Sequence, residues 1–329
     1  MPTFSFVSKA QCLTYCRARK TPMGFASVYN APALAITFCS LVPKPYQAAE
    51  PLSNVPTREQ MIRTLTQYRE LLLILAWKDI SVRYKQAYLG IAWAIIRPLS
   101  LMLIFTLLRS FVGIDSGAVP YPVLAFAALL PWTLFQEAAT AGVNSIVGNA
   151  HLIRKIYFPR EVFPITVVLT KLVEFVINFV ILIAMMAFYG MVPTAQVLWA
   201  PVIIGYTVLV ALGLTLVSAA LNAYYRDIGA GVPILLSLLM YASPIIYPLD
   251  IVKNKLLVQQ AAGAWSKDLY LLYITNPIAG IVDSFQRVVL RGISPDVHTL
   301  MPGILMTGCL LPVSYYVFKR AEAWFADVI

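Results

Sequence analysis

The sequence predicts an all-α, polytopic membrane protein with six transmembrane helices, and three observations support this fold class. Of the 329 residues, 60% are hydrophobic and only 12% are charged, which is too apolar for an ordinary soluble domain. No Asp, Glu, Lys or Arg occurs between Glu174 and Arg226, and a bilayer core is crossed by about 20 helical residues, so this stretch has room for two spans. Lys and Arg collect in short segments between the apolar runs, which is typical of cytoplasmic loops.

Six long apolar runs predict the six spans, and an even number places both termini on one side of the membrane. The spans are expected at Leu89–Leu108, Tyr121–Val147, Val162–Tyr189, Val197–Ala223, Val232–Tyr247 and Leu300–Phe318. The short loops on the side of the termini hold nearly all of the loop Lys and Arg, whereas those opposite offer only Arg109. Positive loops tend to stay in the cytoplasm. We therefore expect a multi-pass membrane protein with both termini cytoplasmic.

The chain is expected to divide into four parts, one of which contains all six spans. Thr57 and Gln60 have capping-box spacing, which predicts a cytoplasmic interfacial helix over residues 57–87, followed by the transmembrane domain, 88–320, and a cytoplasmic tail, 321–329. Residues 1–56 are expected to form a poorly ordered extension. Their apolar stretch Met23–Val42 also resembles a signal sequence or a seventh span, and the sequence does not decide between these readings.

A long segment between the fifth and sixth spans, Pro248–Thr299, is expected to lie outside the cytoplasm. Within it, Leu269–Val289 is apolar but interrupted by Asn276, Pro277, Gly280 and Asp283. Broken helices at membrane depth must be shielded by protein or line a cavity. The pattern therefore predicts a re-entrant or interfacial helical hairpin before the last span.

A charged island, His151–Pro164, lies between two apolar runs on the side of the membrane that holds the positive loops. It combines Arg and Lys with apolar and aromatic side chains, namely Ile153, Arg154, Lys155, Ile156, Tyr157, Phe158, Arg160 and Glu161. Protein interfaces favour that mixture. The island is therefore expected to bind a protein partner, although an ordinary positive loop is the alternative.

Motifs for catalysis or cofactor binding are absent from the sequence. There are only two histidines, His151 and His298, neither with a metal-like partner at short spacing, and the four cysteines form no metal or disulfide framework. No G-x-x-x-x-G-K-[ST] occurs, so the chain is not expected to bind ATP through a P-loop of its own. We expect no metal or cofactor on this chain and no nucleic-acid partner, because no basic face recurs.

Charged residues inside the predicted spans are candidates for contact with a substrate. Arg97 can reach the cytoplasmic headgroups or coordinate a substrate phosphate. Glu137 either lies in the outer or middle part of a water-filled passage or pairs with a residue of a neighbouring helix. Lys171 and Glu174, three residues apart, share a helical face and can neutralise each other. Further candidate channel residues are the aromatic side chains Trp93, Trp132, Phe135, Tyr241 and Tyr247, for which an interfacial belt is the alternative.

Several runs occur in the order found in ABC exporter permeases for lipid-linked polysaccharides. NAHLIRKIYFPR, Asn149–Arg160, resembles the coupling-helix segment of that family, and RELLLILAWKDISVRYKQAYLGIAWA, Arg69–Ala94, resembles the interfacial helix and first span of O-antigen exporters. Further matches are LPWTLF at Leu130–Phe135, Tyr225–Asp227, SPIIYP at Ser243–Pro248, and Asn276–Pro277. The resemblance covers residues 58–320.

The resemblance implies two permease copies that work with separate ATP-binding subunits, which would use ATP and Mg. It implies that a cytoplasmic coupling segment, residues 148–162, docks on the ATP-binding subunit through the island. It also implies that the segment after the fourth span lies near a second contact. The implied coupling residues are Asn149, His151, Leu152, Ile153, Arg154, Lys155, Tyr157, Phe158, Pro159 and Arg160, together with Tyr225, Arg226 and Asp227. Residues 248–296 would form the gate at the outer mouth.

The function that the resemblance implies is that of the transmembrane subunit of an ATP-driven exporter in the bacterial inner membrane. This exporter would move lipid-linked polysaccharide such as O-antigen from cytoplasm to periplasm. The expected partners are an ATP-binding subunit, a second copy of the chain, the lipid-linked polysaccharide and membrane lipids. One alternative keeps the permease fold but exports teichoic acid, a drug or a small lipid. Another is a membrane-embedded glycan-processing enzyme, which the missing catalytic cluster disfavours.

Overall fold

Helices are the only regular elements in the described residues of the computed structural model, which are 69–85, 92–112, 119–155, 159–259, 262–323 and 325. The predicted extension over residues 1–56 lies outside these ranges, as does the first part of the predicted interfacial helix. The described part of that helix is α4, Arg69–Lys85. It packs through Leu72 and Leu75 against Val162 and Ile165 at the start of α8.

Five helical segments are long and apolar enough to cross a membrane. Within the described residues they are Ala92–Phe111 in α5 (Ala92–Val112), Tyr121–Gly142 (α6), Val162–Phe188 (α8), Ala195–Tyr224 (η2, Ala195–Trp199, with α9, Ala200–Tyr224) and Val297–Glu322 (α14). The run predicted as the fifth span forms α10, Asp227–Ala242, which has only 16 residues. At about 1.5 Å per residue it is roughly 24 Å long, shorter than a bilayer core of about 30 Å. The predicted span ends at Tyr247, but α10 ends at Ala242 because Ser243 adopts an extended conformation.

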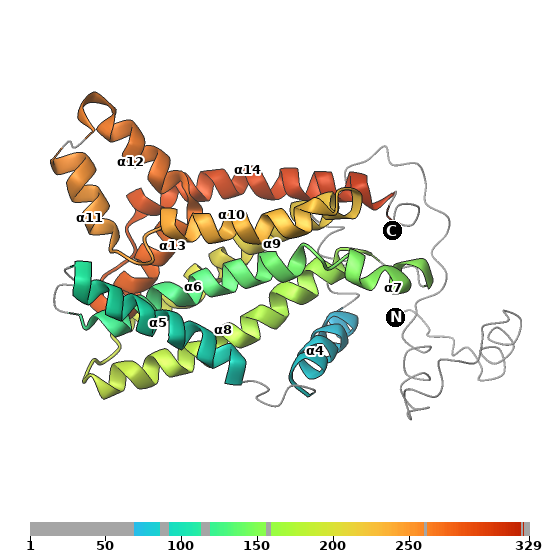
Figure 1. Cartoon of the computed structure of the whole chain (residues 1–329), viewed down its shortest axis with the longest axis horizontal. Helices are drawn as coiled ribbons and strands as arrows, with labels where there is room; N and C mark the ends of the chain where they lie inside the picture. The colour runs from blue at the N-terminus through green and yellow to red at the C-terminus, as the bar shows by residue number, and fades with distance from the viewer. Residues whose placement is uncertain are drawn as a thin grey trace, which may run out of the picture. The chain divides into compact units, whose positions relative to one another are not determined.

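Helix α6 forms the centre of the bundle and contacts α5, α8, α9, α10 and α13 (Figure 1). Its side chains from Val123 to Trp132 are almost completely buried. Gly142, near the end of α6, is required by the close approach of α9, because a Cβ there would lie 2.1 Å from Cγ2 of Thr215. Small residues at such crossings allow helix backbones to approach closely. The interior of one copy is therefore filled by side chains around α6.

The two ends of the bundle differ in structure (Figure 1). At one end, here called the α7 end, lie η1 (Val147–Asn149), α7 (Ala150–Lys155), the turn between α9 and α10, and the last turns of α14. The opposite end, here called the α12 end, carries the predicted gate region. Its elements are α11 (Leu249–Lys253), η3 (Asn254–Val258), η4 (Gly263–Trp265), α12 (Ser266–Thr275), α13 (Pro277–Gln286) and η5 (Arg287–Arg291), of which η3 and η5 are π-helical.

The helix break expected in the gate region lies between α12 and α13, at Asn276. The Asn276 side chain accepts a hydrogen bond from the backbone N–H of Ile278 at 3.1 Å, so it caps α13, and Pro277 occupies the first helical position. Its Nδ2 also donates to Oγ of Ser243 at 2.9 Å. One side chain thus starts α13 and joins it to the end of α10.

Candidate coupling site and intramembrane charge network

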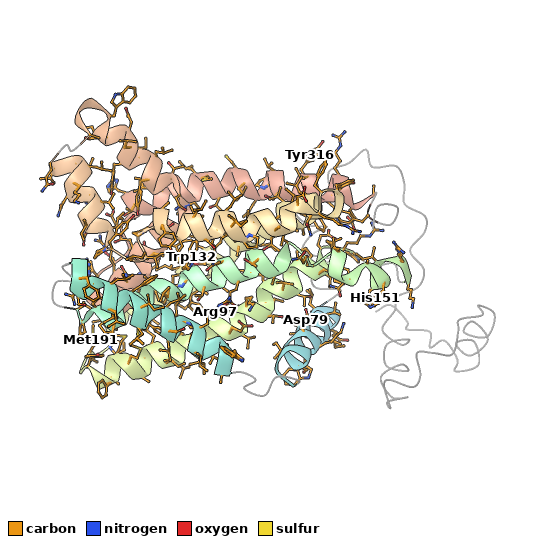
Figure 2. All side chains as sticks on the ribbon, viewed as in Figure 1. Asp79, Arg97, Trp132, His151, Met191 and Tyr316 are labelled. Atoms are coloured by element: carbon orange, nitrogen blue, oxygen red, sulfur yellow. The ribbon has the colours of Figure 1, made fainter. Side chains whose placement is uncertain are left out.

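Helix α7 contains the first residues of the charged island, and both α7 and the preceding η1 are held against the bundle. Nδ2 of Asn149 donates to the carbonyl oxygen of Ser145 at 2.8 Å, which secures the preceding turn. Ile153 is buried and Leu152 is partly buried. His151, Arg154 and Lys155 are exposed, and His151 lies at the α7 end of the bundle (Figure 2). This short helix therefore has an apolar anchor and an outward basic face.

The anchor of α7 belongs to an apolar cluster that joins three parts of the chain. Its buried members are Ile146, Ile153, Phe163, Leu216, Ala219, Ala220, Ala223, Phe318, Ala321 and Phe325. These residues come from the island and its flanks, from the end of α9 and from the end of α14. Close-packed side chains transmit displacement because the interior has few voids. A force on α7 would therefore reach α9 and α14 directly.

The carboxyl-terminal part of the island is bonded to the end of α14 through Arg160, Glu161, Lys319 and Glu322, here called the α8–α14 clamp. The backbone N–H of Arg160 donates to Oε1 of Glu322 at 3.2 Å, and its guanidinium donates to the carbonyl oxygen of Glu322. Nζ of Lys319 forms ion pairs with Oε1 of Glu161 and, at 2.7 Å, with Oε2 of Glu322. Arg160 thus contacts its own chain, whereas the sequence alone suggested a partner contact.

The predicted second contact, Tyr225–Asp227, forms the turn between α9 and α10 and is exposed. This turn is held close to the end of α6 by Asn222, whose Nδ2 donates to the carbonyl oxygen of Val143 at 3.0 Å and to Oδ1 of Asn144 at 3.2 Å. The structure therefore places this turn at the same end of the bundle as α7. Of the other predicted coupling residues, Pro159 is partly exposed, and Tyr157 and Phe158 lie outside the described residues.

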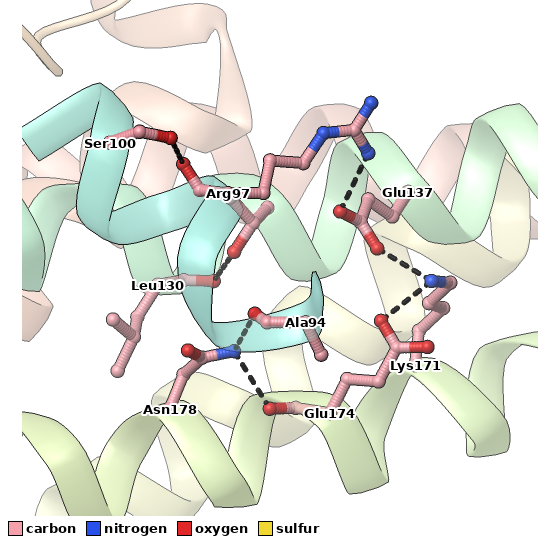
Figure 3. A network of polar contacts seen from close by, with 9 residues as sticks. Ala94, Arg97, Ser100, Leu130, Glu137, Lys171, Glu174 and Asn178 are labelled. Atoms are coloured by element: carbon pink, nitrogen blue, oxygen red, sulfur yellow. Dashed lines mark hydrogen bonds and ion pairs between the residues drawn. The ribbon is translucent and has the colours of Figure 1, made fainter. Parts of the chain in front are cut away.

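The three charged sites predicted within the spans form one network across α5, α6 and α8 (Figure 3). Arg97 pairs with Glu137 at 3.0 Å, and Lys171 pairs with Glu137 at 2.5 Å and with Glu174 at 2.6 Å. The pairing of Lys171 with Glu174 agrees with their spacing, and Glu137 has helix neighbours as partners. Two cations and two carboxylates neutralise one another, which lowers the cost of placing them in an apolar bundle.

A proline in α5 explains a further member of this region, Asn178. Pro98 has no N–H, so the carbonyl oxygen of Ala94 lacks its usual donor within the helix. Nδ2 of Asn178 supplies a hydrogen bond to that oxygen at 3.1 Å (Figure 3). Its Oδ1 is buried without a hydrogen-bond partner among the described residues. A small pocket in this region is lined by Ala94, Pro98, Thr133, Leu134, Glu137, Lys171, Glu174, Phe175 and Asn178.

The predicted aromatic channel residues lie in different environments. Trp132 and Phe135 are buried in the core beside each other, with ring centroids 5.8 Å apart, and both belong to the packing around α6. Trp93 on α5 and Tyr241 on α10 are exposed. The hydroxyl of Tyr247 donates to the carbonyl oxygen of Tyr241 at 3.3 Å, which closes the turn after α10. The hydrophobicity of an aromatic residue does not distinguish these positions in the sequence.

Ion pairs also link the elements of the gate region at the α12 end. Arg291 pairs with Asp250 of α11 at 2.9 Å, and Arg287 lies 3.8 Å from Asp283 and 3.9 Å from Asp296. Asp296 also caps α14 by accepting from the backbone N–H of His298 at 3.0 Å. Burial raises the pKa of Asp283 from 3.8 to about 6, although the nearby Arg287 opposes the shift. These ion pairs connect α11, η5, α13 and the start of α14.

Sequence reasoning missed Lys319, Glu322 and Asn178 as members of these sites. A local signal did exist for Lys319, because its spacing of three from Glu322 in the last turns of a helix favours an ion pair. Asn178 carries no such signal, because its role depends on a proline in another helix. Within the described part of the chain, no group of three His, Cys, Asp or Glu side chains is placed to hold a metal ion.

Comparison with known proteins relates this arrangement to membrane permeases. The ABC-2 type transporter family matches residues 70–259. The O-antigen export system permease protein RfbA of Myxococcus xanthus is 30% identical over 271 residues, which is 82% of this chain and 99% of that protein. The protein of the same name from Klebsiella pneumoniae is 27% identical over 79% of this chain and 95% of its own length. The polysialic acid transport protein KpsM of Escherichia coli is 26% identical over 65% and 79%, respectively.

Proposed function

Because the chain belongs to the ABC-2 type transporter family of membrane permeases, we propose that it is the transmembrane subunit of an ATP-driven exporter for a lipid-linked polysaccharide such as O-antigen. Two relatives, which this chain matches over nearly the whole of their length, are named as O-antigen export system permease proteins. The sequence has no P-loop motif, so ATP hydrolysis with Mg is assigned to a separate subunit. The polysaccharide would move from the cytoplasm to the periplasm of a bacterium.

The observation that supports this function best is the construction of α7. Its apolar side joins the cluster shared with α9 and α14, and its opposite side presents His151, Arg154 and Lys155. A docking element for a motor subunit needs both an exposed face and a firm connection to the transmembrane helices. In our proposal, the ATP-binding subunit binds this face and the turn Tyr225–Asp227, and the apolar cluster carries its movement into the bundle.

Orientation and assembly follow from the same proposal. The α7 end would face the cytoplasm, because its turns carry Arg154, Lys155, Arg226 and Arg320 and positive loops remain inside. Both termini would then be cytoplasmic, and the gate region at the α12 end would face the periplasm. The centre of one bundle is filled around α6, so we place the polysaccharide passage between two copies of the chain.

Reversing the charge of the basic face tests the docking role. In the double variant Arg154→Glu, Lys155→Glu, we expect binding to the ATP-binding subunit to weaken about tenfold or more, because several charge contacts become repulsive. Co-purification from membranes and ATP hydrolysis by the complex would measure this loss. The matched control is Arg320→Glu, which changes an exposed charge at the same end but outside the island. Equal co-purification of both variants would contradict docking on α7.

Deletion of the gene tests the cargo. We expect a strain without the chain to retain finished lipid-linked glycan in the cytoplasm, and complementation to restore glycan at the cell surface. Normal surface glycan in a clean deletion would refute the proposed cargo. Stimulation of ATP hydrolysis in the reconstituted complex by purified lipid-linked glycan, compared with teichoic acid precursors and drugs, would separate the proposed cargo from the other classes.

A further inference from the structure

The two parts of the gate region are attached to the bundle in different ways. Helix α13 is fixed, because all ten of its side chains are buried and Gln286 donates to the carbonyl oxygen of Leu124 of α6 at 3.0 Å. Gly280 allows α13 to lie directly against the start of α14, since a Cβ there would be 2.8 Å from the carbonyl oxygen of Thr299. This helix therefore moves with the transmembrane bundle.

Residues 249–275, here called the arm, contain α11, η3, η4 and α12 and extend outward from the bundle (Figure 1). Few side chains in the described part of the arm are buried, namely Leu249, Ser266 and Ile274. The two ends of the arm meet, because Nδ2 of Asn276 donates to Oγ of Ser243 at 2.9 Å. Segments with few buried contacts open at low cost in free energy. The arm can therefore swing as one unit about the joint between Ser243 and Asn276.

Among the described residues, one ion pair ties the arm to the fixed part of the gate region. Nη1 of Arg291 on η5, which continues α13, pairs with Oδ2 of Asp250 on α11 at 2.9 Å. Burial raises the pKa of the Tyr270 phenol on α12, and so do the charges of three nearby carboxylates, those of Asp283, Asp296 and Asp250. The arm therefore lies against a cluster of charged side chains.

This cluster contains one carboxylate more than it has cations. Its members are the carboxylates of Asp250, Asp283 and Asp296 and the guanidiniums of Arg287 and Arg291. Asp283 has the poorest partners, since Nη1 of Arg287 is 3.8 Å away and Oδ2 of Asp283 is buried without a hydrogen bond among the described residues. A single proton on Asp283 would make the cluster neutral and remove a buried charge.

The other ionisable residues near α13 lie outside the cluster. Helices α6 and α9 also pack against α13. The charged residue of α6 is Glu137, which pairs with Arg97 and Lys171, and the sequence of α9 contains none. His298 follows the cap of α14 at Asp296, and its side chain is exposed. The proton that balances the cluster is therefore assigned to Asp283.

We propose that the arm is a pH-sensitive lid at the α12 end, which stays closed while Asp283 is protonated and loosens when Asp283 is ionised. The inference rests on the proposed function for its direction, because that function places the α12 end in the periplasm. Protons would then reach Asp283 from the outer side of the membrane. Acidic surroundings would hold the lid closed.

The direction of the pH effect follows from the surroundings of Asp283. With the arm closed, burial, opposed by Arg287 and assisted by Asp250, raises the pKa of Asp283 to about 6. Movement of the arm takes Asp250 away and lets in water, which returns this pKa toward its ordinary value of 3.8. The closed position binds the proton more tightly, so its advantage is complete below about pH 3.8 and is lost as pH rises through about 6.

Hydrogen-exchange mass spectrometry tests the lid. The full chain, purified from membranes with its bound subunits, would be placed in phosphatidylcholine nanodiscs, and arm peptides of Asp283→Asn and the unchanged protein compared at the same pH. At pH 7.5 we expect exchange in the arm of Asp283→Asn to be about tenfold or more slower, because a pKa difference of about two units shifts an equilibrium by up to about a hundredfold. The difference should shrink several-fold at pH 4.5, where the unchanged protein also holds this proton.

Breaking the ion pair of the arm should have the opposite effect. Arg291→Gln removes the partner of Asp250, so arm peptides should exchange about two- to fivefold faster at pH 4.5, while peptides of α13 keep their rate. The matched controls are Asp268→Asn, which removes an exposed carboxyl on α12, and His298→Gln, which removes an exposed imidazole on α14. Both should keep the pH dependence of the unchanged protein.

Three results would overturn the proposal. They are equal exchange of the arm in Asp283→Asn and the unchanged protein at pH 7.5, equal slowing of α13 and the arm, and loss of the pH dependence in His298→Gln. Failure of the proposed function is distinguishable, because exchange in the arm requires no cargo. A deletion strain that exports its glycan normally would refute that function and leave the lid intact, whereas failure of the lid leaves glycan export dependent on the chain.

Discussion

At the scale of single residues, Asp283 is a buried carboxyl among the ion pairs of the gate region. It lies on α13, outside the long apolar helices, and its side chain is only 6% exposed. Oδ2 has no hydrogen-bond partner among the described residues, and Arg287 is 3.8 Å away. Burial raises the pKa of Asp283 to about 6, so the folded protein holds this proton more tightly than the unfolded chain.

Replacing Asp283 with Asn should therefore change the pH dependence of stability. Between the ordinary pKa of 3.8 and about 6, the folded state binds more protons than the unfolded state, so the free energy of unfolding falls as pH rises. The penalty above this window is at most about 3 kcal/mol, because one pKa unit corresponds to about 1.4 kcal/mol. We expect Asp283→Asn to raise the apparent Tm at pH 7.5 and to flatten its decline from pH 4 to 6.

Thermal unfolding in detergent across this pH range would measure the effect. The control is Asp268→Asn, which removes an exposed carboxyl on α12 of the same region. That variant should keep the pH dependence of the unchanged protein. Parallel curves for Asp283→Asn and the unchanged protein would show that the buried carboxyl has no such role.

Residue-level prediction from sequence succeeded where partners are near in the chain. The spacing of Lys171 and Glu174 predicts their ion pair, because helix geometry alone brings them together. Their links to Glu137 and Arg97 cross 34 and 40 residues and depend on how three helices pack. The burial of Trp132 likewise depends on that packing. Local periodicity contains no information on either point.

At the scale of elements, the α8–α14 clamp joins the start of α8 to the end of α14. Movement of either helix during a transport cycle would therefore act on this clamp. Lys319 holds Glu161 at the start of α8 and Glu322 in its own helix, and all three side chains are largely buried. Removing one partner of a buried pair leaves a charge without compensation. We expect Lys319→Met to lower the free energy of unfolding by roughly 1–3 kcal/mol and to reduce transport more than ATP hydrolysis.

A double-mutant cycle with Glu161→Gln would separate pairing from packing. If Glu161 and Lys319 act together, the double variant should lose much less stability than the sum of the two single losses. Apparent Tm and the ratio of transport to ATP hydrolysis are the two readouts. Arg320→Met serves as the exposed control on the same helical turn. Additive losses would mean that the two side chains contribute independently.

Element prediction was strongest for the long apolar runs and weakest at their ends. Five of the six predicted spans correspond to helices long enough to cross a membrane, and Asn276 and Pro277 do break the helix in the gate region. The fifth span is predicted at Val232–Tyr247, whereas the helix in this part of the chain, α10, occupies Asp227–Ala242. Hydropathy is similar on both sides of Ser243, so composition does not reveal that the backbone leaves the helix there.

At the scale of the whole molecule, the filled centre of one bundle predicts an assembly of two copies. Phe126, Leu129, Leu130 and Trp132 on α6 are fully buried, so a polymer needs a passage elsewhere. Native mass spectrometry of the complex purified in mild detergent should show two copies of the 36.5 kDa chain with two ATP-binding subunits. A functional complex that contains a single copy of this chain would contradict that arrangement.

Helix α14 is fastened at both ends, and this has a mechanical consequence. Lys319 and Glu322 tie its last turns to the start of α8, while Asp296 at its first turn contacts Arg287 of the gate region. Pro302 and Pro312 each remove a backbone N–H donor from the ladder between these ends. We expect α14 to resist axial compression and to bend at its prolines, so a thrust from the α7 end arrives at the gate region while sideways movement is absorbed.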